Sequence, residues 1–150
     1  MRYLCSIRKR DNKPIKNKKF IIMKIFVFSW SFDYKEDQDA KKVQDVLNSL
    51  NTHEVVKFSN NHVHLINSYG NSFGYEEIKK VAKELKIVFT YASFNYNVSQ
   101  AKKVQELSKK LKAFKFYIED IVDDTYICCI DSEEGDNEEF FEFIEALEKV

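Results

Sequence analysis

The histidines of this 150-residue chain are the side chains best suited to hold a metal ion. His62 and His64 are separated by one residue, so on a β-strand their rings would point to the same face. His53 lies one expected strand earlier, and imidazole nitrogens are common zinc ligands. The spacing nominates no further ligand, and two solvated histidines on a hairpin are the simpler interpretation. A metal site at His53, His62 and His64 is therefore only an alternative, and the sequence predicts no cofactor.

An acidic stretch, residues 131–139, precedes and enters the last expected helix. Its ligand spacing and its glycine position differ from those of a calcium-binding EF-hand loop. Acidic side chains at the start of a helix also favour the positive end of the helix dipole. We expect this stretch to contact a partner protein rather than a cation, through Glu133, Glu134, Glu138 and Glu139.

Two short segments with similar residues follow the two most apolar strands, Ser31-Phe32-Asp33-Tyr34 and Ser93-Phe94-Asn95-Tyr96. Both are expected to be loops that enter the N-terminus of a helix, where unpaired N–H groups attract anions. The alternative is a hydrophobic staple supported by the Asp and Asn side chains. No glycine-rich phosphate loop accompanies them. The candidate binding residues here are Trp30, Phe32, Asp33, Tyr34, Phe94, Asn95 and Tyr96.

The cysteines Cys5, Cys128 and Cys129 are odd in number, and two of them are adjacent. Adjacent cysteines on a strand point to opposite faces, so we expect Cys128 and Cys129 to have packing roles. An odd set without zinc-finger spacing is typical of a reducing compartment. The cytoplasm is the expected location, with a nuclear or organellar address in the Lys-rich residues 8–19 as the alternative.

The elements that must position these residues occur twice. Residues 40–44 (AKKVQ) recur as residues 101–105, and further matches surround them in the same order at separations of 61 or 62 residues. They include Lys24-Ile25 with Lys86-Ile87 and Glu76-Glu77 with Glu138-Glu139. Internal repetition of this kind indicates duplicated structural units. We therefore divide the chain into a basic extension, residues 1–23, and two repeats, residues 24–85 and 86–150, which pack as one compact domain.

Each repeat shows the periodicities of a strand, a helix, two strands and a helix. The strands are expected at residues 24–32, 54–59, 62–68, 86–94, 114–120 and 125–131, with an Asn pair and an Asp pair at the hairpin turns. This β-α-β-β-α order resembles the ferredoxin-like superfold without its last strand. The resemblance implies an α+β fold, with antiparallel strands in one sheet or two and with helices covering one face.

The missing strand of the first repeat can be the opening strand of the second. For the second repeat, residues 2–10 are the candidate, because Tyr3, Cys5 and Ile7 alternate with polar residues. An unfilled sheet edge would instead allow a homodimer by strand pairing. The apolar run of residues 20–30 is too short to span a bilayer, so no membrane is expected. Met23 directly precedes the first repeat and is an alternative start to Met1.

The zero formal net charge hides a strong polarity along the chain. Residues 1–24 hold nine Lys/Arg and one Asp, a net charge of +8, and residues 119–150 hold thirteen Asp/Glu and one Lys, a net charge of −12. Because no catalytic motif is evident, the leading prediction is a non-enzymatic protein-binding or regulatory module, such as an inhibitor, an immunity-type protein or an adaptor. It would use its acidic C-terminal half or the open sheet face.

Two other classes of function remain as alternatives. The β-α-β-β-α-β order is similar to that of RNA-recognition modules, and residues 25–28 echo their first aromatic strand. The basic, glycine-containing strand that is diagnostic of such modules is missing, and the acidic second half repels phosphate. An RNA-binding module would rely on the basic N-terminus. A small-molecule or metal-binding protein, using the three histidines, is the other alternative.

Overall fold

A computed structural model describes residues 25, 27–35, 40–59, 61–68 and 74–150. Within these ranges the chain forms one six-stranded antiparallel sheet and four α-helices, which is an α+β fold. The order of the strands across the sheet is β2-β3-β1-β4-β6-β5. The strands are β1 (Val27–Asp33), β2 (His53–Ser59), β3 (His62–Asn67), β4 (Val88–Asn97), β5 (Lys115–Val122) and β6 (Thr125–Asp131).

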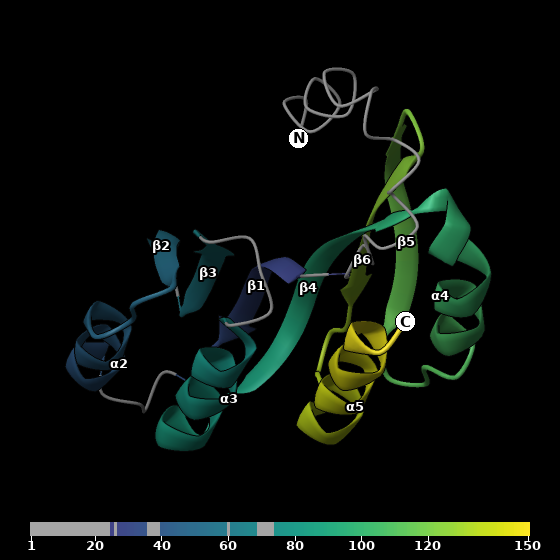
Figure 1. Cartoon of the computed structure of the whole chain (residues 1–150). Coiled ribbons are helices and arrows are strands. Elements are labelled where there is room, and N and C mark those ends of the chain that lie inside the picture. Colours follow the sequence, from purple (N-terminus) through teal and green to yellow (C-terminus); the bar gives the residue numbers. More distant parts are fainter. Residues whose placement is uncertain (1–24, 26, 36–39, 60, 69–73) are drawn as a thin grey trace, which may run out of the picture.

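The helices lie side by side along one face of the sheet (Figure 1). They are α2 (Ala40–Asn48), α3 (Gly74–Leu85), α4 (Ala101–Ser108) and α5 (Asn137–Glu148). Each is amphipathic, with apolar residues three or four positions apart. Val43 and Leu47 of α2 and Phe140 and Ile144 of α5 are buried against the sheet side of the molecule. The apolar spacing of the sequence predicts a helix at residues 98–111, but residues 98–100 form a 3₁₀ turn and α4 ends at Ser108.

The opening strands of the two halves, β1 and β4, pair with each other at the centre of the sheet. This pairing is the one expected if the first half uses the opening strand of the second. The core is continuous across this pair, because Trp30 and Phe32 of β1 contact the ring of Phe89 on β4, at 6.2 and 5.3 Å between centroids. Phe140 of α5 stacks on the same Phe89 ring at 5.6 Å.

Both hairpin turns lie at the positions that the sequence predicts. Asn61, between β2 and β3, has φ 67°, and Asp123, between β5 and β6, has φ 55°. Asn and Asp tolerate this left-handed conformation better than other residues with a side chain. The short turns fix the register of each hairpin, with Ser59 opposite His62 and Val122 opposite Thr125.

None of the helices in the described part of the chain is both long and apolar enough to cross a membrane. The basic extension and the strand expected at residues 2–10 lie outside the described residues.

Candidate functional site

The two segments that were expected to be ligand loops are strands. Residues 31–33 lie in β1 and residues 93–96 lie in β4, so the loop prediction is wrong for both. Strand alternation sends their aromatic side chains into the core. The buried members of this candidate set, each at most 8% exposed, are Trp30, Phe32, Tyr34, Phe94 and Tyr96. Asp33 is exposed at the end of β1, and Asn95 is half-buried on β4.

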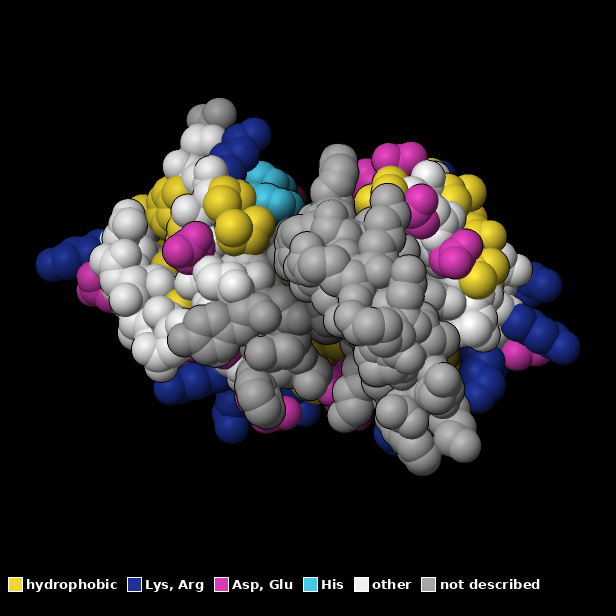
Figure 2. Space-filling model, turned by 45° about the horizontal axis from the view of Figure 1, so that its top comes forward, with side chains coloured by type: hydrophobic (Ala, Val, Ile, Leu, Met, Phe, Trp, Pro, Cys, Tyr) yellow, Lys and Arg dark blue, Asp and Glu magenta, His cyan; other side chains and the backbone are white. Residues whose placement is uncertain are grey.

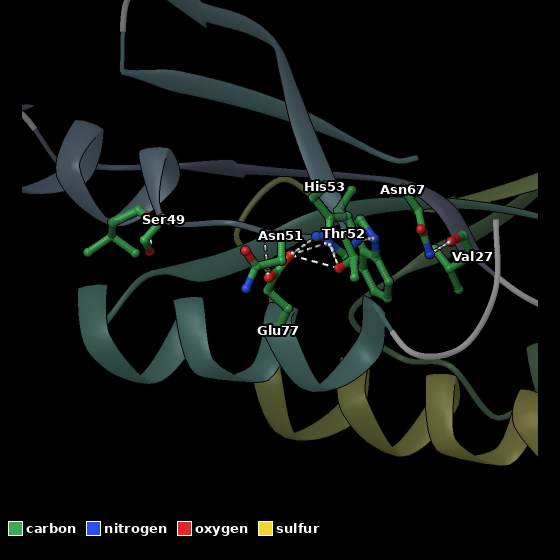
Figure 3. A network of polar contacts seen from close by, with 9 residues as sticks. Val27, Ser49, Asn51, Thr52, His53, Asn67 and Glu77 are labelled. Carbon is green, nitrogen blue, oxygen red and sulfur yellow. Dashed lines mark hydrogen bonds and ion pairs between the residues drawn. The ribbon is translucent and has the colours of Figure 1, made fainter. Parts of the chain in front are cut away.

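His53 is a buried structural residue rather than an open metal ligand (Figure 3). The Trp30 indole N–H donates a hydrogen bond to His53 Nε2 at 2.9 Å, and His53 Nδ1 lies 3.0 Å from Glu77 Oε1. This pattern fixes a neutral ring that carries its proton on Nδ1. Burial lowers the pKa of His53, and the hydrogen bond and charge of Glu77 oppose burial only in part. Both ring nitrogens are therefore engaged within the protein.

Glu77 joins the start of α3 to the loop before β2 (Figure 3). Its carboxylate accepts hydrogen bonds from the Asn51 N–H at 2.7 Å and from the Thr52 N–H and hydroxyl at 3.0 and 2.7 Å. Burial alone would raise the pKa of Glu77. The donors on Asn51, Thr52 and His53 outweigh burial and lower the pKa to about 2. The carboxylate thus stays charged and holds the loop.

His62 and His64 lie on β3 among polar side chains of the sheet. Asp33 Oδ1 is 2.6 Å from His62 Nδ1, and Ser31 Oγ is 2.5 Å from His64 Nδ1. Burial lowers the pKa of His64, and the positive charges of His62 and Lys57 add to this. The structure does not bring His53 to this pair, and the described residues contain no cluster of three potential metal ligands.

Cys128 and Cys129 occupy opposite faces of β6. Cys128 packs in the apolar core, whereas Cys129 is buried outside that cluster. Burial raises the pKa of the two thiols to about 11 and about 12, and for Cys129 the nearby Glu119 and Asp131 carboxylates add to the rise. Both thiols are therefore protonated at neutral pH, when thiols are poor nucleophiles.

The acidic turn, residues 131–136, contains exposed residues of the predicted site. Its backbone is tied to β4, since the Ser132 N–H donates to the Thr90 carbonyl at 2.9 Å. The Ser132 hydroxyl accepts the Gly135 N–H at 2.8 Å. Gly135 has φ +76°, and a Cβ there would lie 2.8 Å from the Phe89 carbonyl oxygen. Only glycine fits this position without a shift of the backbone.

The acidic residues in and beyond this turn divide into two groups. Asp136 caps α5 by accepting the Glu139 N–H at 3.1 Å, and Glu139 itself accepts the N–H groups of Lys112 and Ala113. These two acids therefore hold the fold together. Glu133, Glu134 and Glu138 are exposed, as Asp136 is, but they accept no backbone N–H group within the described part of the chain. The fixed turn thus leaves carboxylates that face solvent.

An open pocket of about 570 Å³ lies between the acidic turn and the start of β5. Glu133, Glu134 and Asp136 line one side, and Asp131 lies at the end of β6. Lys115 and Tyr117 line the pocket from β5. The pocket therefore combines a concentrated negative charge with one exposed aromatic ring.

Hydrophobic side chains are exposed along β5, whose first residue, Lys115, lies in register with Asp131 of the acidic turn. Tyr117, Ile118 and Ile121 are 46, 44 and 56% exposed. In Figure 2, hydrophobic and acidic side chains intermingle on one flank of the molecule, and the histidines gather on the other. Sequence reasoning missed these residues. The sequence did hold a signal for this exposed strand. Residues 115–122 mix apolar and acidic side chains without strict alternation, which is typical of an exposed edge strand. We call the exposed residues of β5, together with the acidic turn, the acidic flank.

A second open hollow lies between α3 and α5 and is lined by lysines. Its charges are largely matched within the helices. Lys79 Nζ is 3.7 Å from a carboxylate oxygen of Glu145, and Lys80 Nζ is 3.9 Å from Glu84 Oε1. This hollow is a solvated contact between helices, and it lacks the excess of one charge that marks the acidic flank.

Comparisons with known proteins assign no family to this chain. No protein-family model matches it, and no curated protein does. Among solved structures it is similar to the TBP of Methanococcus jannaschii, with 13% sequence identity over 85% of this chain and 98% of that chain. The TM-score is 0.28, which is too low to indicate a shared fold or a shared function.

Proposed function

We propose that the protein is a non-enzymatic binding module whose acidic flank docks a basic segment of a partner protein. The observation that carries this proposal is the exposed Tyr117 ring, which lines one pocket together with the solvent-facing carboxylates of Glu133 and Glu134. Exposed apolar side chains with surrounding polar groups are typical of interaction sites. The anchored turn supports the proposal further, because a preorganised surface loses less entropy on binding.

The charge of the acidic flank selects the partner. Four carboxylates of the acidic turn, those of Asp131, Glu133, Glu134 and Asp136, line the pocket with the single cation Lys115, so a basic partner is attracted and an acidic one is repelled. The same field opposes two copies of this chain meeting through their acidic flanks. A homodimer that joins two acidic flanks therefore has less support than a different, basic partner. A regulator, an inhibitor or an adaptor would each work through such a surface.

The RNA-binding alternative has less support. RNA-binding sheets stack bases on aromatic side chains that face solvent. Of the aromatic residues of β1, Trp30 and Phe32 are instead at most 1% exposed, and Phe28 is half-buried. The second half of the chain, with its excess of carboxylates, would repel phosphate.

One pair of residues has the chemistry of a nucleophile and a base. Ser31 Oγ is 2.5 Å from His64 Nδ1, but Ser31 is only 4% exposed. The nearby Asp33 contacts His62 rather than His64, so it does not orient the base as in a catalytic triad. This geometry favours a structural role for the pair, and with it a binding function over a catalytic one.

We also infer that the fold is a tandem of two ferredoxin-like repeats that share their central strands. The order β2-β3-β1 in one half is mirrored by β5-β6-β4 in the other, which supports the duplication. In this interpretation β4 lies where a fourth strand of the first repeat belongs, and β1 takes the equivalent place beside β4. The second repeat then needs no strand from residues 2–10.

The proposed function is tested with the full chain as bait for proteins of its native cell, after nuclease treatment. The wild type is compared with Glu133→Gln/Glu134→Gln and with the control Asp45→Asn/Glu106→Gln, which removes two exposed acids from α2 and α4. We expect at least one stoichiometric protein to bind the wild type and the control but not the first variant. A partner that binds all three baits equally would rule out the acidic flank. Material that disappears with nuclease would favour RNA.

A further inference from the structure

β5 is the last strand in the sheet order, so one of its sides faces away from β6. A bulge between Ile118 and Asp120 divides this strand into two parts. After the bulge, the Asp120 carboxylate accepts the Ile121 N–H at 2.8 Å, so this part of the strand caps its own backbone. Before the bulge, residues 115–118 pair regularly with β6 and carry no such cap. Among the described residues, none pairs with the outer edge of β5 at residues 115–118, so this part of the edge is the place for an added strand.

The acidic pocket lies beside this part of the edge. Lys115 and Tyr117 both line it, and they are two residues apart, so they share one face of β5. Lys115 is in register with Asp131, which lines the pocket as well. A strand added along residues 115–118 would place alternate side chains on the same face, next to Glu133 and Glu134. The edge and the pocket thus form one continuous surface.

We propose that the partner binds by adding an extended strand to residues 115–118 of β5, with a Lys or Arg side chain seated in the acidic pocket. This inference rests on the proposed function and specifies its mode of binding. In β-strand addition the backbone hydrogen bonds give affinity, and pockets for alternate side chains give specificity. The occupant is thus a segment of another protein with a basic residue on one face and apolar residues on the other, which meet Ile118.

The opposite edge of the sheet, β2, provides the contrast. It also exposes apolar side chains, with Val56 at 52%, and it also has a bulge, between Val55 and Lys57. Its neighbourhood is different, because Lys57 lies in register with His64 and raises the local positive charge. A basic segment therefore has an electrostatic reason to choose β5 over β2.

The test uses a fluorescein-labelled peptide of six residues, Lys-Val-Arg-Val-Lys-Val, with blocked ends. A second peptide has the same side chains but N-methyl groups on the residues whose N–H groups would face β5, and a third has Glu in place of each basic residue. Binding to the full chain is followed by fluorescence anisotropy, and backbone amide shifts are mapped by NMR. We expect the basic peptide to shift the amides of residues 115–118 more than those of β2. N-methylation should weaken binding about tenfold, as for the loss of one or two hydrogen bonds.

The outcomes separate the mode of binding from the proposed function. Equal binding of the methylated peptide, with shifts confined to residues 131–136, would overturn strand addition while the basic-partner function stands. Equal binding by wild type and Glu133→Gln/Glu134→Gln would overturn the function itself, and so would equal binding of the acidic peptide. Self-association that Ile118→Lys abolishes, without any peptide binding, would show that the occupant is a second copy and would also overturn the proposal.

Discussion

The two halves of the molecule anchor a loop in the same way but fill the core beneath it with different side chains. In each half, a glutamate on the second helix accepts backbone N–H groups from the loop that follows the first helix. Glu77 binds the N–H groups of Asn51 and Thr52, and Glu139 binds those of Lys112 and Ala113. These residues are related by the same separations, 61 or 62, as the repeated sequence.

We call the contact of Glu77 or Glu139 with these backbone N–H groups a clasp. The core beneath the clasp differs between the halves. Trp30 and His53 form a buried hydrogen bond in the first half. The positions 62 and 61 residues later are Ala92 and Phe114, and the Phe114 ring packs on Phe140 with 5.5 Å between centroids. The clasp satisfies backbone donors and therefore depends on a carboxylate at one position. The core needs side chains of the right volume and a hydrogen-bond partner for each buried polar group. These needs can be met by a polar pair in one half and by apolar side chains in the other.

The largest expected effect comes from Trp30→Ala, which puts alanine in the first half where the second half has Ala92. The Trp30 ring contacts Phe89 and Phe140 at 6.2 and 5.9 Å between centroids, and its N–H satisfies His53. Its removal leaves a cavity and an unpaired buried nitrogen. We expect a loss of about 3–5 kcal/mol in the free energy of unfolding, measured by urea denaturation with circular dichroism. A loss below about 1 kcal/mol would show that the core closes around the gap.

The paired variants Glu77→Ala and Glu139→Ala compare the two clasps directly. Glu77 also supports the buried His53, and its side chain is 15% exposed. We expect Glu77→Ala to cost about 2–3 kcal/mol and Glu139→Ala about 1 kcal/mol, because water can replace the exposed partner at Lys112. The two midpoints of urea denaturation are measured at pH 7. Equal losses would mean that His53 adds nothing to the first clasp.

The dependence of stability on pH should also distinguish the halves. Because the pKa of His53 is lowered from 6.5, the unfolded chain takes up that proton first, and stability falls as the pH drops below about 6.5. The pKa of Glu77 is about 2 against an ordinary 4.5, so its contribution is complete above pH 4.5 and is lost as the pH falls towards 2.

His53→Phe, which copies Phe114 into the first half, tests the upper of these two windows. We expect the variant to lose less stability than the wild type between pH 7 and pH 5, while the fall below pH 4.5 remains. His64 is present in both proteins, so the difference between the two curves isolates His53. Parallel curves from pH 7 to pH 5 would contradict the lowered pKa.

The smallest effect on stability is expected for Glu133→Gln/Glu134→Gln. Both side chains are exposed on the acidic turn, so we expect a change within about 0.5 kcal/mol, measured by the same denaturation. Asp136→Ala is the matched variant in the same turn, and it should cost about 1 kcal/mol because it removes the cap of α5. A large loss from the first variant would mean that these acids serve the fold rather than a partner.

The sequence by itself determined the elements and their order. Apolar residues at helical spacing predicted the buried faces of α2 and α5, and the Asn and Asp pairs predicted both hairpin turns. These features depend on local backbone preferences and on which face of one element is buried, so a window of a few residues is enough to read them. The repetition of residues 40–44 at 101–105 predicted in the same way that the two halves are related.

Only the tertiary structure decided how residues far apart in the chain meet. It extended β1 and β4 through segments that local signals had indicated as loops, because pairing at the centre of the sheet satisfies their backbone groups. It separated His53 from His62 and His64 and joined it to Trp30 and Glu77. It also divided the acids into those that hold backbone N–H groups and those, such as Glu133, that face solvent. Such distinctions depend on contacts between distant segments, which residue types and spacing do not encode.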